Sequence, residues 1–128
     1  MRSLLMILAF LALAVPAIAQ ERPMASVTSP SGALVVSVTT DGDGRPSYAV
    51  SRLGRAVIEP SRLGFILTDA PKLERGLELT AQPATDHDET WEQPWGERRE
   101  IRNHYRELRV TFTERADLRR TFDVVFRV

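Results

Sequence analysis

Apolar and polar positions alternate along most of the chain after residue 20. The alternating residues are Leu34, Val36 and Val38, then Tyr48 and Val50, Phe65 and Leu67, Leu77 and Leu79, Leu108, Val110 and Phe112, and finally Phe122, Val124, Phe126 and Val128. A period of two with β-branched and aromatic side chains is typical of half-buried antiparallel strands. Prolines recur between residues 23 and 94 at the spacing of hairpin connections. The pattern predicts an all-β fold built as an antiparallel β-sandwich.

Two polar segments have the composition of turns. Residues 29–32 precede the first clear strand, and residues 41–44 read Asp-Gly-Asp-Gly between two strands. A calcium loop is the alternative for residues 41–44, but that pattern needs a third ligand before the glycine and a glutamate further on, and this segment has neither. We therefore expect a hairpin turn there.

One segment is ambiguous on periodicity alone. Ile101, Tyr105, Leu108 and Phe112 are spaced by 4, 3 and 4 residues, which also fits one face of a helix. Strand alternation is clear only from Leu108 onward. The pattern leaves residues 97–107 open between helix and strand.

The N-terminus has the organisation of a cleavable secretory signal. Arg2 precedes an apolar run from Leu4 to Val15, and Ala17 and Ala19 supply the small side chains of a cleavage site. A membrane span needs about 20 apolar residues, so the run is too short for an anchor, which is the alternative. We expect residues 1–19 to be a signal peptide, Gln20 to become the mature N-terminus, and residues 20–128 to be an exported domain, periplasmic or extracellular.

The composition of the chain limits the classes of molecule that it is expected to bind. The chain has 17 Lys and Arg against 17 Asp and Glu, which leaves no basic surface of the kind that binds nucleic acid. It has no cysteine, so an exported protein of this kind depends on its core or on a partner domain for stability. We expect no nucleic-acid partner, no membrane span and no disulfide.

The last strand predicts that the domain is incomplete. Residues 121–128 keep full alternation to Val128 with no turn residue, and a bare apolar strand invites aggregation. We expect residues 20–128 to be the N-terminal half of a sandwich that is truncated within a strand. The alternative is a natural terminal strand.

The densest group of chemically active side chains lies in residues 86–98. Asp86, His87 and Asp88 suggest a metal site, but neighbouring side chains on a strand point to opposite faces and rarely converge on one ion. The second interpretation is paired-carboxylate catalysis, for which the candidates are Glu89, Glu92, Glu97 and Glu100. Sequence alone brings no two of these carboxylates together.

The third interpretation of this group is recognition. Trp91 and Trp95 flank a Pro-Trp-Gly turn and offer flat apolar surface for a sugar ring or another domain. The alternative is that both tryptophans plug the end of the sandwich. No catalytic residue and no metal ligand is predicted in this chain.

The same residues carry a resemblance to a known family. Residues 89–97, Glu-Thr-Trp-Glu-Gln-Pro-Trp-Gly-Glu, and residues 101–108, Ile-Arg-Asn-His-Tyr-Arg-Glu-Leu, resemble the N-terminal domain of glycoside hydrolase family 97. Residues 29–32, 47–50 and 60–64 fit the same pattern. The likeness therefore covers nearly all of the chain after the signal.

The resemblance implies a β-supersandwich of the galactose-mutarotase type, and it favours strand and loop for residues 97–107. Family members are exported bacterial α-glucosidases and α-galactosidases, in which this domain precedes a (β/α)8 barrel. The barrel carries the catalytic carboxylates beside a calcium ion, and the glutamate that this domain gives to calcium lies beyond Val128 in the family pattern. No catalytic or calcium-binding residue is therefore carried over to this chain.

Together these observations predict a supporting role. The chain is expected to be the N-terminal segment of an exported α-glycosidase that packs beside a catalytic barrel in cis and reaches α-linked oligosaccharides through the intact enzyme. Trp91, Trp95 and Glu97 are the residues expected nearest to substrate or to the domain interface. The alternative is a free-standing exported carbohydrate-binding or assembly module without enzymatic activity.

Overall fold

The computed structural model describes residues 24–116 and 118–128. The predicted signal peptide and its cleavage site between Ala19 and Gln20 lie outside the described residues. The described part forms strands only, and it holds no helix that could span a membrane. The strands are β1 (Ala25–Thr28), β2 (Leu34–Thr40), β3 (Pro46–Arg52), β4 (Arg55–Arg62), β5 (Leu77–Ala81), β6 (Thr85–Glu92), β7 (Glu100–Glu114) and β8 (Thr121–Arg127).

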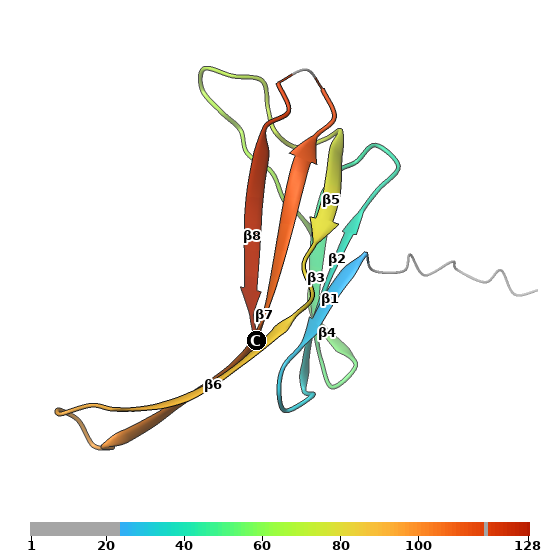
Figure 1. The fold of residues 1–128 in the computed structure, drawn as a ribbon. Helices are drawn as coiled ribbons and strands as arrows, with labels where there is room; N and C mark the ends of the chain where they lie inside the picture. Colours follow the sequence, from blue (N-terminus) through green and yellow to red (C-terminus); the bar gives the residue numbers. More distant parts are fainter. Residues whose placement is uncertain (1–23, 117) are drawn as a thin grey trace, which may run out of the picture.

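Two antiparallel sheets face each other (Figure 1). The first is a simple meander in the order β1-β2-β3-β4. In the second, β7 is the centre: β5 and β6 follow one another along one of its sides, and β8 pairs along the other. The predicted all-β sandwich is confirmed.

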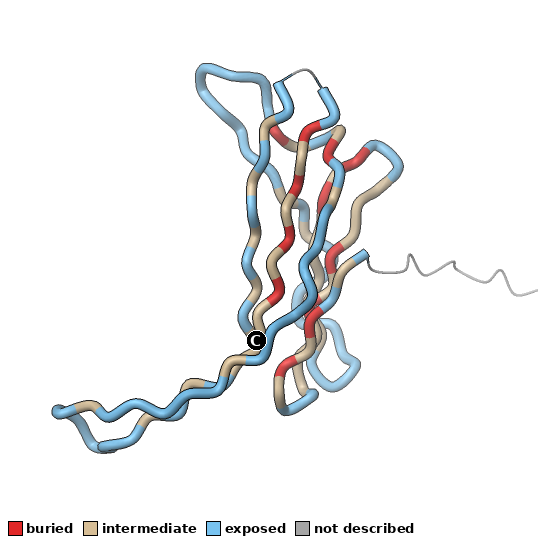
Figure 2. The backbone as a smooth tube through the Cα atoms, viewed as in Figure 1, coloured by how far each residue is buried: buried red, intermediate tan, exposed pale blue. Residues whose placement is uncertain are grey.

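The core lies between the sheets, on the faces that the alternation predicted. Figure 2 shows the buried positions as red segments on the facing strands. The buried apolar residues are Val27, Val36 and Val38 from the first sheet and Leu77, Leu108, Val110 and Phe112 from the second, with Leu73 from the preceding loop. Tyr48 of β3 meets Phe126 of β8 across the layers, with ring centroids 5.9 Å apart. Removal of this apolar surface from water is what holds the two sheets together.

Residues 41–45 form the predicted turn and also tie the sheets together. The Asp41 carboxylate accepts hydrogen bonds from the backbone N–H groups of Asp43 and Arg45, at 3.0 and 2.8 Å. Gly44 has a φ of 68°, and its carbonyl accepts the Leu77 N–H at 3.0 Å. A Cβ on Gly44 would lie 2.7 Å from the Leu77 nitrogen, so only glycine allows this approach.

Strand β7 is 15 residues long and leaves the sandwich halfway along its length. Its second half pairs with β5 and β8, whereas its first half pairs with β6 alone. Residues 85–107 therefore form a two-stranded arm that projects from the body, as Figure 1 shows. The helical alternative for residues 97–107 is wrong for residues 100–107, because the cross-strand partners of β6 fix them in an extended conformation.

A bulge separates the arm from the sandwich. Ala81 pairs with Val110 and Thr85 pairs with Glu107, so three residues of one strand face two of the other. Pro83 is one of the three. A bulge bends a strand and increases its local twist, which accounts for the change in direction of the arm.

The structure corrects one predicted strand. Phe65 and Leu67 were expected on a strand, but Phe65 makes only an isolated bridge to Leu73. The preceding segment, Arg55–Arg62, forms β4 instead, which the alternation did not predict. Nearly all of β4 is exposed on both faces, so no buried face imposes a period of two on its sequence.

Candidate functional site

The arm has two chemically different faces. On one face His87, Glu89 and Trp91 of β6 stand opposite Tyr105, Asn103 and Ile101 of β7. The His87 and Tyr105 rings lie 4.7 Å apart, and the guanidinium of Arg127 lies 5.2 Å from the centre of the Tyr105 ring. This aromatic face makes cross-strand contacts that stabilise the pair.

The other face is a ladder of ion pairs. Arg102 donates two hydrogen bonds to the Asp88 carboxylate, at 2.8 and 2.6 Å. Asp86 accepts a bond from Arg106 at 3.0 Å and contacts His104 at 3.2 Å. These bonds hold the pKa of both aspartates below the usual value, with Arg102 the main cause at Asp88 and Arg106 the main cause at Asp86.

Four carboxylates of the arm, those of Asp86, Asp88, Glu89 and Glu92, are engaged by side chains of the same arm. Glu89 contacts His87 at 3.1 Å and accepts a bond from Asn103 at 3.0 Å, which lowers its pKa. Glu92 accepts two bonds from Arg99. Glu92 and Glu100 are directly opposite each other at the last pair of the β6–β7 ladder. The arrangement is that of a solvated, ion-paired hairpin.

The aspartates and His87 do not form a metal site. Asp86 and Asp88 share one face while the His87 ring is stacked on the other, as the strand geometry predicts. Across residues 24–116 and 118–128, no group of three acidic, histidine or cysteine residues could hold an ion. The calcium that the resemblance implies therefore finds no ligand set in the described part of this chain, and we assign it none.

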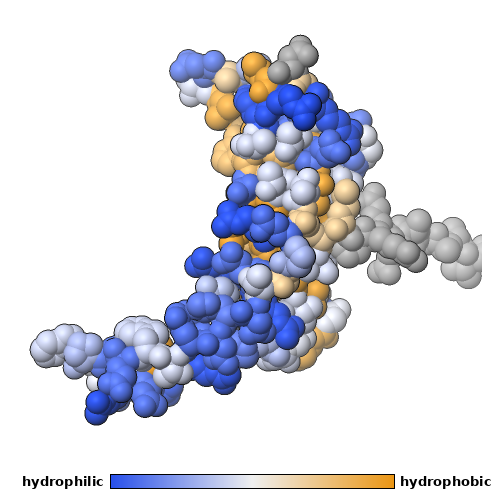
Figure 3. Space-filling model, in the orientation of Figure 1, coloured by the Kyte–Doolittle hydropathy of each residue, from blue (hydrophilic) through white to orange (hydrophobic). Residues whose placement is uncertain are grey.

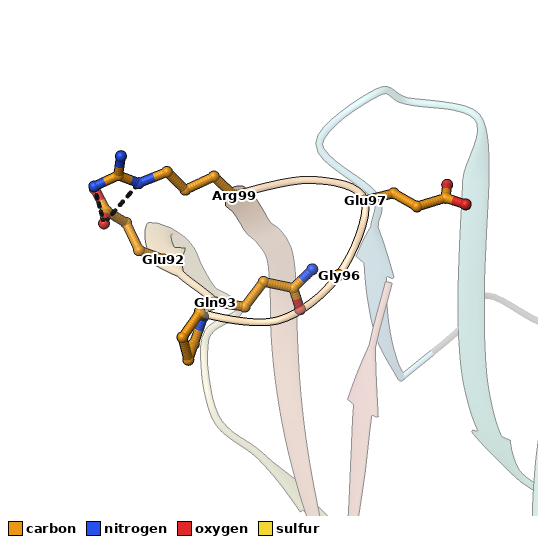
Figure 4. A pocket seen from close by; sticks show the side chains of 6 residues that line it. Glu92, Gln93, Gly96, Glu97 and Arg99 are labelled. Carbon is orange, nitrogen blue, oxygen red and sulfur yellow. Dashed lines mark hydrogen bonds and ion pairs between the residues drawn. The ribbon is translucent and has the colours of Figure 1, made fainter.

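The tip loop, residues 93–99, is held in shape by Gln93. Its backbone N–H donates to the Arg99 carbonyl at 2.9 Å, and its side-chain amide donates to the Arg98 carbonyl at 2.8 Å. Figure 4 shows the Gln93 side chain inside the loop and the Arg99–Glu92 pair beside it. Gly96 has a φ of 129°, and a Cβ there would lie 2.6 Å from the Gln93 amide nitrogen.

The tip presents the predicted recognition residues to solvent. Trp95 is 85% exposed and Trp91 is 48% exposed, so neither is packed inside the sandwich that residues 24–116 and 118–128 form. Glu97 points away from the loop (Figure 4) and is also exposed. An open cleft of about 580 Å³ lies at the loop, lined by Glu92, Gln93, Pro94, Gly96, Glu97 and Arg99.

The structure brings Trp95 and Glu97 to one loop and places Trp91 on the arm just before it. Figure 3 shows the arm mostly in blue and white, whereas orange gathers on the sandwich. The two exposed tryptophans therefore stand on an arm that is otherwise hydrophilic. Gln93 and Arg99, which shape the loop, were not predicted as site residues.

The sequence of this chain matches a protein-family model. The model described as glycosyl-hydrolase 97 N-terminal matches residues 27–128. The chain belongs to this family. The resemblance that residues 89–108 carried is thereby confirmed.

Solved structures of enzymes share the fold of this chain. A glycoside hydrolase family 97 enzyme from Pseudoalteromonas sp. strain K8, in complex with acarbose, is 30% identical with a TM-score of 0.73, over 80% of this chain and 15% of that chain. A variant of the same enzyme in complex with panose is 31% identical with a TM-score of 0.72, over 80% and 15% of the two chains. A beta-arabinopyranosidase has the same fold at 24% identity and a TM-score of 0.68, over 82% of this chain and 16% of that chain. This chain therefore spans about 15% of the length of the family 97 enzyme it matches.

Proposed function

We propose that this chain is the N-terminal β-sandwich segment of an exported α-glycosidase and that it supports a catalytic (β/α)8 barrel. The sandwich is the anchor, and the arm is the part that reaches the sugar site or the barrel beside it. The chemistry of hydrolysis belongs to carboxylates of the barrel. This chain positions the tip and screens the site from water.

One observation carries the proposal: Trp95 stands almost fully exposed on a loop whose backbone is fixed by Gln93. A large apolar side chain held on an ordered but solvated loop has no use in the folding of the sandwich. It has a use when a partner surface or a sugar ring covers it. The family match, and the oligosaccharides in the Pseudoalteromonas structures, support a sugar-processing partner.

The carboxylates of the arm support the assignment of chemistry to another domain. A retaining or inverting glycosidase needs two carboxyl groups about 5–10 Å apart with a sugar between them. In the arm, Asp86, Asp88, Glu89 and Glu92 are each engaged by Arg, His or Asn of the same arm. The partners of Asp86, Asp88 and Glu89 lower the pKa of each carboxyl, which makes these three poor general acids at neutral pH.

A hydrolysis assay tests the division of labour. The purified chain is incubated with nitrophenyl α-glucoside and α-galactoside, and release of nitrophenol is followed. We expect no turnover above that of buffer. Turnover that survives repurification would show that the chain carries its own active site.

The exposed tryptophan also supports the second candidate, a free-standing sugar-binding module. That candidate predicts saturable binding of an α-linked oligosaccharide by the chain alone, lost in Trp95→Ala and kept in Leu53→Ala. Leu53 is a matched control because it is also an exposed apolar side chain, at the β3–β4 turn. The coding DNA after the Val128 codon separates the candidates: further strands and a βα-repeat barrel support the glycosidase segment, and a stop codon supports the module.

A further inference from the structure

The arm joins the sandwich through β7, and the two ladders of β7 differ at this junction. On the side of β5 and β6 the ladder is interrupted by the bulge at residues 82–84. On the side of β8 the register is unbroken, and Glu107 pairs with Arg127. Arg106 and Val128 exchange backbone hydrogen bonds at 2.9 and 3.1 Å. Figure 1 shows the end of β8 beside the point where β7 leaves the sandwich, so β8 is placed to hold the arm.

The side chain of Arg127 crosses the junction. Its Nε donates a hydrogen bond to the Glu107 carboxylate at 2.8 Å, at the position where β7 pairs with both β6 and β8. The same guanidinium lies 5.2 Å from the centre of the Tyr105 ring, two residues further along the arm. A guanidinium is attracted to the face of an aromatic ring, and its planar shape limits the angles at which it meets ring and carboxylate together. Arg127 therefore ties a residue of the arm to a residue of the junction.

Tyr105 connects this contact to side chains further out on the same face. Its ring lies 4.7 Å from the His87 ring, and His87 Nε2 lies 3.1 Å from the Glu89 carboxylate. Glu89 in turn accepts a hydrogen bond from Asn103 at 3.0 Å. A row of contacts therefore runs from β8 along the arm and ends one cross-strand pair before Trp91.

We propose that Arg127 is a positioning residue for the tip, because it fixes the angle at which the arm leaves the sandwich and so the place where Trp95 stands. The seven residue steps of β7 from Glu107 to Glu100 span about 23 Å, so a rotation of about 10° at the junction moves the end of the arm by about 4 Å. The consequence for a sugar site rests on the proposed function, whereas the angle of the arm does not.

Arg109 offers a matched control for Arg127. It makes the same kind of pair on the same two strands, with its guanidinium 3.0 Å from the Asp123 carboxylate. Both members of that pair lie within the sandwich part of the β7–β8 ladder. The side chains of Arg109 and Arg127 are 42% and 62% exposed, so neither belongs to the core. Loss of the Arg109 side chain therefore removes an ion pair but no contact to the arm.

Spin labels measure the angle of the arm directly. The chain has no cysteine, so Thr90→Cys on the arm and Glu78→Cys on β5 introduce two labelling sites, both exposed. Pulsed electron paramagnetic resonance then gives the distribution of distances between the labels. We expect one narrow distribution with Arg127 present and a width at least about twofold greater in Arg127→Ala, with no change in Arg109→Ala. Circular dichroism checks that each variant keeps its strands.

Variants of Tyr105 test the same bridge from the side of the arm. Tyr105→Leu removes the ring and should also broaden the distribution, whereas Tyr105→Phe keeps the ring and should keep the distribution narrow. Because Arg127 and Tyr105 share one contact, the double variant should broaden it by less than the sum of the two single variants. An unchanged width in Arg127→Ala, an equal broadening in Arg109→Ala, or fully additive broadening in the double variant would overturn the proposal.

Kinetics of the intact enzyme test what the angle does for the tip. Arg127→Ala should lower kcat/KM for an α-linked oligosaccharide by up to about tenfold when Trp95 is present, and it should have no further effect in Trp95→Ala. An equal loss in both backgrounds would show that Arg127 acts on stability and not through the tip. If Trp95→Ala itself leaves kcat/KM unchanged, the proposed function fails, while the width of the distance distribution still decides the role of Arg127.

Discussion

The tip loop gives the sharpest prediction, because one added methyl group should open the loop without unfolding the sandwich. In Gly96→Ala the new Cβ would lie 2.6 Å from the Gln93 amide nitrogen, so the side chain of Gln93 must move. Its 2.8 Å bond to the Arg98 carbonyl is then lost, which costs about 0.5–1.5 kcal/mol. A φ of 129° in a residue other than glycine adds strain of about 1–3 kcal/mol.

Together the two effects disfavour the closed loop by about 2–4 kcal/mol. The arm is a two-stranded ribbon, which has little stability of its own, so the loop opens locally. The opening equilibrium should rise by about 30-fold to 1,000-fold. The midpoint of thermal unfolding should stay within about 1 °C, because no core contact changes.

Hydrogen exchange measures this opening at single amides. The Gln93 amide, bonded to the Arg99 carbonyl at 2.9 Å, should exchange faster in Gly96→Ala by the factor given above. The Leu77 amide, bonded to the Gly44 carbonyl between the sheets, should keep its rate. Gly42→Ala is the control, because a Cβ there meets nothing within 4 Å. Equal protection of Gln93 in both variants would refute the role that we give to Gln93 and Gly96.

Two further predictions concern the core and the arm. Phe112→Ala should lower the free energy of unfolding by about 3–5 kcal/mol and unfold the chain at room temperature, because Phe112 is fully buried at the centre of the core. A circular dichroism melt unchanged from wild type would contradict the assignment of the core. The ion-pair ladder should weaken in acid, because the pKa of Asp88 in the folded chain lies below its unfolded value of 3.8. The contribution of Asp88 to the stability of the arm is therefore complete above pH 3.8 and is lost as the pH falls through the folded pKa. Arm amides in Arg102→Gln should therefore already exchange faster at neutral pH and show a smaller further acceleration below about pH 4 than in wild type, and identical acid profiles would exclude the Arg102–Asp88 pair as the cause.

The sequence predicted the buried strands well because burial imposes a visible pattern. Leu34, Val36 and Val38 alternate because one face of β2 is in the core, and Leu108, Val110 and Phe112 alternate for the same reason. The turn at residues 41–45 followed from its aspartates and glycines. In each case the residues that produce the pattern are close together in the sequence, on a single strand or in a single turn.

The exposed elements left no such pattern. Residues 85–92 carry polar or charged side chains on both faces, because both faces of the arm meet water, and this does not resemble the apolar alternation of a half-buried strand. The strand in residues 100–107 was favoured only by the family resemblance, because β6 alone holds residues 100–105 extended. Trp91 and Trp95 were placed in one recognition group, yet their exposure could not be foreseen, since it depends on the bulge at residues 82–84 that turns the arm away.

We propose that the arm tip contacts the sugar site of a glycosidase, and steady-state kinetics of the intact enzyme measure the effect of that contact. Trp95→Ala in that enzyme should lower kcat/KM for an α-linked oligosaccharide by about tenfold, the equivalent of one aromatic contact, with the melting temperature unchanged. Leu53→Ala should leave kcat/KM at the wild-type value. An intact enzyme whose kcat/KM is the same with Trp95→Ala as with Leu53→Ala would contradict the account.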